Sequence, residues 1–373
     1  MGITFIHTAD WQIGKPFGTL AAMASLLADA RFGAIDRIAG VAAAANARHV
    51  LVAGDVFDGI SVPDAVLSQT VARMAAYPHL VWHLLPGNHD PAQPGGVWQR
   101  IEPLLSGTKI RLHLTAEPVE IEPGVLLLPA PLKTRAMSTD PTDYMASHVS
   151  APGVIRIGFA HGSVRGFGSQ GDAAVPIEPT RDRSARLDYL ALGDWHGLTR
   201  IGDRVWYSGT PEPDGYKDNE PGHCLAVTIA ATGTPPVVER HRTAMYEWLE
   251  RTVAIRGAAD LAALAADLKS RGAPVRPILL ALKLDGRVSI SDGTAIEAEI
   301  AGIRGLVRHL DLDTANMRPS ADASELEAVF TGGLAAVAKR IAGQQSQGDA
   351  DMQRIAGRAL QMLANMAQGA KQP

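Results

Sequence analysis

At five places in this chain, polar side chains directly follow apolar runs of strand length. The clearest is Gly87-Asn88-His89-Asp90, which ends the apolar run 81–86. The same arrangement recurs at Asp10, Asp55, His161 and Asp194-Trp195-His196. Short apolar runs that end in Gly, Asp or His are typical of buried strands. Because ligand sites of α/β folds lie at the carboxyl ends of strands, the pattern predicts a metal-dependent hydrolase.

The order of the apolar runs predicts an α/β fold for the first two-thirds of the chain. Two segments with apolar residues at helical spacing, 21–48 and 63–77, join the strands that end near Asp10, Asp55 and Asn88. This alternation is typical of helices layered on a partly parallel sheet. A chain of 373 residues is long enough for two or three domains. We expect a first domain at 1–244, a small α+β domain at 245–318 and a helical hairpin at 319–373.

The predicted hairpin has two apolar stripes at helical spacing, separated by a Gln-, Ser- and Gly-rich loop at 343–349. We expect a helix N-cap at Ser320-Ala321-Asp322. The first stripe is Leu326, Phe330, Leu334, Val337 and Ile341, and the second is Met352, Ile355, Ala359, Leu363 and Met366. Amphipathic helices of this kind pack against their own domain or dock a partner, and the pattern leaves both interpretations open.

Composition and charge restrict the binding partners and the compartment. The net charge of −4 gives no overall attraction for nucleic acid, so a DNA-binding surface would have to be a local basic patch. Local candidates are Arg181, Arg183 and Arg186, and Lys133 with Arg135, with ordinary solvated charge as the alternative. The single cysteine, Cys224, excludes an internal disulfide, and no apolar run approaches the ~20 residues that span a bilayer. We expect a cytoplasmic protein without a membrane association.

Five motifs, taken in order, resemble the calcineurin-like metallophosphoesterase superfamily. They are Asp10-Trp11-Gln12, 54–58, 87–90, Ala160-His161-Gly162 and 193–196. Within that superfamily the segments 7–11, 54–58 and 207–211 are most similar to SbcD-type DNA-repair exonuclease subunits. The resemblance extends over about the first 240 residues, and it implies a sandwich of two mixed sheets flanked by helices. The remainder resembles the small cap domain and ATPase-binding helices of that family in layout.

The resemblance also implies a metal centre with two divalent ions, most often Mn²⁺, with Mg²⁺ as the alternative. One ion would be held by Asp10, Asp55 and His196. Asp55 would bridge to a second ion, which Asn88 and His161 would also bind. Such a pair of ions activates water and neutralises the charge on a phosphate.

Two further roles follow from the resemblance. His89 would contact the scissile phosphate and protonate or stabilise the leaving oxygen. Asp58 would orient His89, or serve only as a turn residue after its strand.

Two ligand positions depart from the pattern of that family, which has His where Gln12 and Asp194 stand. We include both among the candidate metal ligands. An amide oxygen and a carboxylate in place of two imidazoles favour Mn²⁺ or Mg²⁺ over Zn²⁺. If Gln12 does not coordinate, the first metal position is weakened.

Four side chains near the motifs are candidates for substrate contact. Trp11 and Trp195 would stack on a base or pack against the neighbouring loop. Arg165 and Phe167 would shape the substrate cleft or belong to a plain flexible loop. His7, inside the first strand, is predicted to be a buried, hydrogen-bonded histidine.

Three functions remain open from the sequence. The first is a metal-dependent DNA nuclease that works with an SbcC-like ATPase, with a homodimer implied by the resemblance. The second is a phosphodiesterase or phosphatase for a nucleotide or another small phosphoester. The third is a non-catalytic subunit that binds DNA or a partner through a degraded metal site, an alternative that Gln12 and Asp194 motivate.

Overall fold

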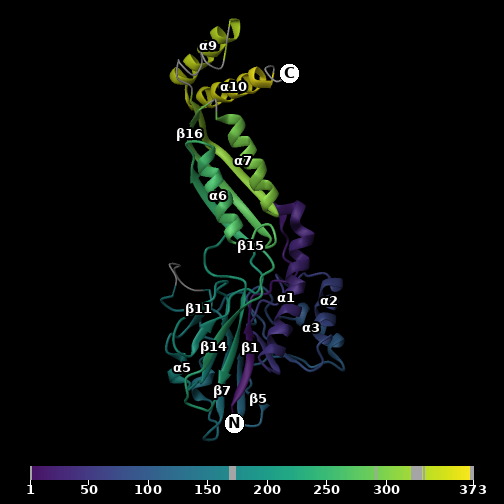
Figure 1. Cartoon of the computed structure of the whole chain (residues 1–373). Coiled ribbons are helices and arrows are strands. Elements are labelled where there is room, and N and C mark those ends of the chain that lie inside the picture. The colour runs from purple at the N-terminus through teal and green to yellow at the C-terminus, as the bar shows by residue number, and fades with distance from the viewer. Residues whose placement is uncertain (1, 168–173, 290–291, 321–329, 331, 370–373) are drawn as a thin grey trace. The chain divides into compact units, whose positions relative to one another are not determined.

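The computed structural model describes residues 2–167, 174–289, 292–320, 330 and 332–369. The chain divides into two compact units, Met1–Met245 (unit 1) and Tyr246–Pro373 (unit 2), which Figure 1 shows from purple to yellow along the chain. The division of unit 2 into a cap domain and a hairpin stays a prediction.

Unit 1 contains, in its described part, two six-stranded mixed sheets. The first has the strand order β14-β13-β1-β2-β3-β4. These strands are β1 (Ile3–Thr8), β2 (His49–Val52), β3 (Val81–Leu84), β4 (Ile110–Leu112), β13 (His223–Ile229) and β14 (Val237–Arg242). Strands β1 to β4 run parallel, whereas β13 is antiparallel to both of its neighbours. The parallel strands therefore present their carboxyl ends at one edge of the sheet.

The second sheet has the order β11-β12-β10-β7-β6-β5. Its strands are β5 (Val119–Glu122), β6 (Val125–Ala130), β7 (Ile155–His161), β10 (Tyr189–Gly193), β11 (Thr199–Arg200) and β12 (Val205–Tyr207). Strands β6, β7, β10 and β12 run parallel, and β5 and β11 pair antiparallel at the two sides. A two-stranded ribbon, β8 (Ser163–Val164) and β9 (Pro176–Ile177), follows β7.

Alternation along the strands explains how the layers stack. In β2 and directly after it, Val50 and Val52 pack with the apolar cluster beneath the helices, whereas Leu51 and Ala53 join the cluster between the sheets. Successive side chains of a strand point to opposite faces, so a continuous apolar run is what a doubly covered strand requires. The helices of the first layer are α1 (Ala24–Ala44), α2 (Asp64–Ala75) and α3 (Val97–Ile101), which lie together on one side of unit 1 in Figure 1.

Shorter helices complete unit 1. They are η1 (Gly18–Met23), η2 (Glu102–Leu105), α4 (Tyr144–Ser147) and α5 (Arg181–Ser184). Met145 of α4 and Ala185, directly after α5, pack on the outer face of the second sheet with Leu190 and Leu192. The result is two mixed sheets flanked by helices, and the predicted fold class is confirmed.

Unit 2 begins with three parallel strands in the order β15-β16-β17, joined by two helices. The elements are β15 (Glu247–Ala254), α6 (Ala258–Ser270), β16 (Ile278–Ser289), α7 (Gly293–Leu306) and β17 (His309–Ser320). Leu261 of α6 and Ile303 of α7 pack with Leu280 and Leu282 of β16 in one buried cluster. Both helices therefore bury their apolar stripes against the same sheet.

Two further helices end the described chain, α9 (Gly333–Gln347) and α10 (Ala350–Gly369). They pack on each other through Phe330, Ala338 and Leu360. Strand β17 extends through Ser320, and the N-cap at Ser320-Ala321-Asp322 stays a prediction, because Ala321, Asp322 and Leu326 lie outside the described residues. Several residues of the predicted apolar stripes are exposed, namely Leu334, Val337, Met352, Ile355 and Met366. Every helix in the described residues is too short or too polar to cross a membrane.

Candidate metal centre

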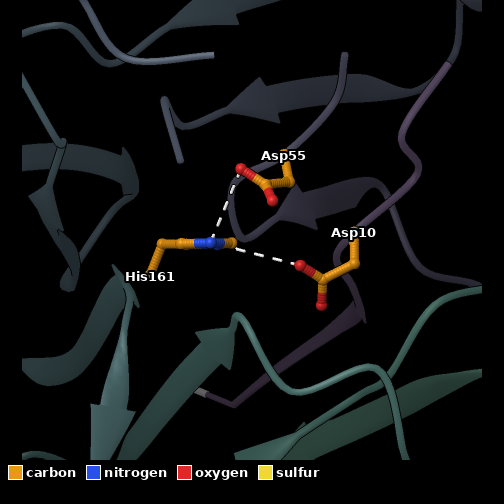
Figure 2. A group of neighbouring side chains, drawn as sticks. All are labelled: Asp10, Asp55 and His161. Carbon is orange, nitrogen blue, oxygen red and sulfur yellow. Dashed lines mark ion pairs between the residues drawn. The ribbon is translucent and has the colours of Figure 1, made fainter. Parts of the chain in front are cut away.

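Acidic and imidazole side chains from both sheets meet at the carboxyl ends of parallel strands. Asp10 follows β1, Asp55 follows β2, and His161 is the last residue of β7. Each offers a ligand atom, and these atoms all lie within 4.8 Å of one another (Figure 2). His161 lies between the two carboxylates, with Nε2 3.5 Å from Asp55 Oδ1 and Nδ1 3.9 Å from Asp10 Oδ1. All three side chains are buried, so the cluster is shielded from bulk solvent.

Unusual backbone conformations bring these side chains together. Asp10, Asp55 and Asp194 all adopt positive φ, at 54°, 52° and 102°. Non-glycine residues in this region are strained and gather at functional sites. A Cβ at Gly54 would lie 2.2 Å from Nδ1 of His161, and one at Gly87 would lie 2.1 Å from Oδ1 of Asp55. Only glycine allows the chain to pass so close to these two side chains.

One side of the cluster, which we call the Asn88 half, consists of Asp55, Asn88, His161 and Asp194. Asn88 Nδ2 donates to Asp194 Oδ1 at 3.2 Å, and that oxygen lies 3.8 Å from His161 Nε2. Asn88 Oδ1 and His161 Nε2 are buried and have no hydrogen-bond partner among the described residues. Leaving a buried polar atom unpaired costs about 1–3 kcal/mol, so such atoms require an explanation. A divalent cation held by these oxygen and nitrogen atoms would satisfy both, and the residues fit one.

The other side, which we call the Gln12 half, consists of Asp10, Gln12, Asp55 and His196. Gln12 is 1% exposed, and its side-chain nitrogen lies 3.1 Å from Nε2 of His196. Its side-chain oxygen accepts a hydrogen bond of 3.0 Å from Lys15. Lys15 also forms an ion pair with Asp214, whose carboxylate lies 3.4 Å from Nδ1 of His196. Gln12 is therefore held between a lysine and a histidine.

Charges within the cluster shift the pKa values of its members. Burial alone would lower the pKa of His161, but the carboxylates of Asp55 and Asp10 raise it to about 9. Burial raises the pKa of Asp10 to about 6, although His161 and His196 oppose that shift. His161 without a metal ion is therefore an imidazolium at neutral pH, and a bound cation would take the place of its proton.

His89 lies beside Asp55 in the Asn88 half. Its side chain is 45% exposed, and its backbone N–H donates to Asp55 Oδ1 at 2.9 Å. Its Nδ1 lies 3.1 Å from the main-chain oxygen of Asp58 and 3.8 Å from the carboxylate of the same residue. The ring is thus oriented by the main chain of Asp58 more closely than by its side chain. Its Nε2 is left facing Asp55, 4.0 Å from Oδ2.

The candidate substrate-contact residues differ in their exposure to solvent. Trp11 is 2% exposed and donates to the Thr8 hydroxyl at 3.0 Å, so its buried ring offers no face to a base. This placement matches the packing alternative, and the substrate-contact interpretation of Trp11 is not supported. Trp195 is 36% exposed and contacts Phe167 edge to face, while Phe167 stacks on Tyr207. Arg165 is exposed directly after β8.

Arg181 and His7, two further residues considered in the sequence analysis, are buried and make contacts within the fold. Arg181 is buried and pairs with Asp140 and Asp143, so it does not contribute to a basic surface patch. His7 is buried, with its ring nitrogens 3.0 Å from the Tyr189 hydroxyl and 3.1 Å from the Leu192 carbonyl. The prediction of a buried, hydrogen-bonded His7 is confirmed.

Sequence reasoning missed Lys15, Asp214 and Ser163. Lys15 and Asp214 flank Gln12 and His196, and the Ser163 hydroxyl donates to Asp194. Lys15 lies three residues after Gln12, and Asp214 lies three residues after the 207–211 motif. Closeness to motif residues was therefore a usable signal, although the pairing of Lys15 with Asp214 spans almost the whole of unit 1.

Comparison with known proteins agrees with this geometry. The sequence profile named calcineurin-like phosphoesterase matches residues 3–181. Unit 1 belongs to the calcineurin-like phosphoesterase family. This match supports phosphoester hydrolysis, and the buried cluster of Asp10, Asp55 and His161 is compatible with the divalent metal ions that the family uses. The chain is also 27% identical to the SbcD component of the nuclease SbcCD from Rhodobacter capsulatus, over 76% of this chain and 81% of that protein. The predicted superfamily is confirmed.

Proposed function

We propose that this chain is a nuclease that hydrolyses phosphodiester bonds of DNA, with Mn²⁺ as its metal. The observation that carries the proposal is the pair of buried ligand atoms beside Asp55, Asn88 Oδ1 and His161 Nε2, which lack partners within the described part of the chain. A relative that is named a nuclease supports DNA as the substrate, and the oxygen-rich ligand set supports Mn²⁺.

Each residue of the centre has a role in this proposal. Bound divalent ions supply activation of water and neutralisation of charge on the phosphate. The carboxylates of Asp10, Asp55 and Asp194 hold positive charge at the site. His89 donates Nδ1–H to the Asp58 carbonyl, so its Nε2 carries a proton only in the imidazolium form. In that form His89 gives the Nε2 proton to the leaving oxygen as the P–O bond breaks.

The test is cleavage of end-labelled single- and double-stranded DNA by the purified chain with Mn²⁺. Asp55→Ala should abolish cleavage, whereas Asp203→Ala, at an exposed carboxylate paired with Arg200, should not. The same preparations are assayed on bis(p-nitrophenyl) phosphate. Hydrolysis of that diester by wild type with no cleavage of any DNA would contradict the nuclease proposal. Inactivity on both substrates would favour the non-catalytic alternative.

A small phosphoester is the second candidate substrate. Two observations favour it: the net charge is −4, and Arg181 of the predicted basic cluster is engaged in buried ion pairs. Binding of a duplex releases counterions, so affinity for DNA should fall steeply with salt, whereas a small phosphoester should show a weak dependence. Competition of unlabelled DNA with the small diester at low and high salt separates the two.

We further propose that α9 and α10 dock an SbcC-like ATPase, because the relative is a subunit of a complex. The exposed apolar residues Leu334, Val337 and Ile355 would supply the contact. Copurification with such an ATPase should be lost in Leu334→Ser with Ile355→Ser. Retention by that variant, with its melting temperature unchanged, would contradict the proposal. Homodimer formation is an independent expectation that sedimentation of the purified chain tests.

A further inference from the structure

The two halves of the candidate centre differ in what already occupies their ligand atoms. In the Asn88 half, Asn88 Oδ1 and His161 Nε2 meet no hydrogen-bond partner in the described ranges of the chain. In the Gln12 half, the corresponding amide and imidazole atoms are engaged with each other and with Lys15. A cation entering the first half replaces the ring proton of His161 but displaces no hydrogen-bond partner of these two atoms, whereas one entering the second must displace protein contacts.

The amide of Gln12 is held in one orientation. Lys15 can only donate hydrogen bonds, so the Gln12 atom that faces it at 3.0 Å must be the oxygen. The Gln12 nitrogen then faces Nε2 of His196 at 3.1 Å and donates to it. Turning the amide over would place its NH₂ group against the ammonium of Lys15. Gln12 therefore presents a donor, and not a ligand oxygen, to the position that a metal ion would share with His196.

His196 is fixed in the matching state. Because the Gln12 NH₂ group can only donate, Nε2 of His196 carries the lone pair and the ring proton lies on Nδ1, which is 3.4 Å from the Asp214 carboxylate but not in hydrogen-bond geometry with it. That lone pair accepts from Gln12. Binding a cation at Nε2 requires the Gln12 amide to leave, and the amide can offer its oxygen only by giving up Lys15.

Lys15 also brings an ammonium group to this half. Its side chain is 26% exposed and is anchored by Asp214, whose own side chain is 8% exposed. An ammonium held against Gln12 opposes a divalent ion in the same half, because like charges in a partly buried site are weakly screened. In the Asn88 half, no Lys or Arg of the described residues pairs with Asp55 or Asp194, and the positive charge beside them belongs to His161, which gives up its proton when the ring binds a cation.

We infer that the centre is unequal: the Asn88 half binds one divalent cation tightly, and Lys15 with Gln12 keeps the Gln12 half weak. Lys15 acts as a specificity-determining residue that sets the number of metal ions bound at a given concentration. This inference rests on the proposed metal centre and not on DNA as the substrate. Two hydrogen bonds, one of them from a charged donor, must be exchanged in the Gln12 half, so its affinity should be weaker by about tenfold to a hundredfold.

The test counts metal ions without any substrate. Equilibrium dialysis of the full chain against Mn²⁺ should give one tight site and a second site at least about tenfold weaker. Electron paramagnetic resonance should show an isolated Mn²⁺ signal at one equivalent, and a spin-coupled signal only at high Mn²⁺ concentration. Two sites of equal affinity in wild type would overturn the inference.

Variants of Lys15 test whether this residue causes the weak affinity of the second site. Lys15→Met and Lys15→Met with Gln12→His should tighten the second site about tenfold or more and produce the spin-coupled signal at lower Mn²⁺. Lys109→Met, at an exposed lysine, is the matched control and should change neither site. If the dissociation constant of the second Mn²⁺ site is unchanged in both Lys15 variants, and their melting temperatures equal that of wild type, the proposed role of Lys15 is overturned. Absence of DNA cleavage by a chain that binds one tight and one weak Mn²⁺ would reject only the nuclease proposal.

Discussion

The Asn88 half and the Gln12 half share Asp55 but are built in opposite ways. The Asn88 half leaves buried ligand atoms unpaired within the described structure, which destabilises the metal-free protein and prepares the site for a cation. In the Gln12 half the amide of Gln12 is engaged by Lys15 and His196, and only Nδ1 of His196, beside Asp214, lacks a hydrogen-bond partner among the atoms described above. A residue at a ligand position of a motif is therefore expected to bind metal only when its ligand atom is not already hydrogen-bonded to another part of the protein.

The largest expected effect comes from comparing the two histidines. His161→Ala removes a buried nitrogen that has no hydrogen-bond partner among the described residues and would bind the metal ion, so hydrolysis of bis(p-nitrophenyl) phosphate should fall about a thousandfold. His196→Ala should lower it only about tenfold, because the Gln12 half is already weak. Rates are measured at saturating Mn²⁺, with melting temperatures as the check on folding. Equal losses in the two variants would mean that the halves do not differ.

His89 separates proton transfer from metal binding within the Asn88 half. His89→Gln should lower DNA cleavage about 10²- to 10³-fold while leaving the tight Mn²⁺ site in place. The loss should be smaller for a p-nitrophenyl diester, because p-nitrophenolate leaves without a proton. Asp58→Asn, which keeps the main-chain carbonyl that orients His89, should have a much weaker effect. A loss independent of the leaving group would exclude His89 as the proton donor.

The pH at which the halves are compared matters because unit 1 carries buried neutral histidines. His113 follows β4 and contacts Phe159 of the second sheet, and burial lowers its pKa to about 4. The unfolded chain therefore binds a proton that the folded chain does not, between about pH 6.5 and 4, and stability falls as the pH falls through that window. From about pH 7 to 5 the cost is about 2 kcal/mol for this residue.

The check is urea denaturation at those two pH values. His113→Leu should shrink the pH difference in the free energy of unfolding by about 2 kcal/mol, and the exposed His79→Leu should leave it unchanged. An equal pH difference in wild type and His113→Leu would show that His113 is not the source. Metal titrations of the two halves should therefore be done above about pH 6.5, where protonation of His113 does not change the stability of unit 1.

The smallest effect is expected from removing the side-chain amides of Asn88 and Gln12. Asn88→Ala removes a neutral oxygen ligand that water can replace, so the Mn²⁺ concentration for half-maximal activity should rise about tenfold. Gln12→Ala should change it less than about threefold, because the oxygen of Gln12 is bound to Lys15. Activity is measured as a function of Mn²⁺ for both variants. A larger shift for Gln12→Ala than for Asn88→Ala would reverse the assignment of the halves.

Much of the fold was predictable because burial produces local sequence patterns. The run that became β1 was bounded correctly at Ile3–Thr8, since a strand covered on both faces must be largely apolar. The layer of helices followed from the spacing in 21–48 and 63–77. Unit 2 was harder, because strand β17 extends to Ser320, a residue type that also favours helix caps. The length of β17 follows its pairing with β16, in which Ser320 lies opposite Ser289, and such pairing cannot be read from the local sequence.

The motifs predicted which residues lie at the site, but not the contacts that those residues make with other parts of the fold. Asp10 and Asp55 follow adjacent parallel strands and His161 ends a parallel strand of the second sheet, so their convergence was expected from topology. The burial of Trp11 was one of two alternatives, and the engagement of Gln12 by Lys15 was not expected, because it depends on a tertiary contact of Lys15 with Asp214. A sequence motif specifies chemistry at a position but not its neighbours across the fold.

An unequal centre can be seen directly in a crystal structure of the full chain soaked in Mn²⁺, with anomalous diffraction used to locate the ions. We predict one strong peak, coordinated by Asp55, Asn88, His161 and Asp194, and at most a weak second peak beside His196. Two peaks of equal height, or a single peak between Gln12 and His196, would contradict the inequality of the two halves.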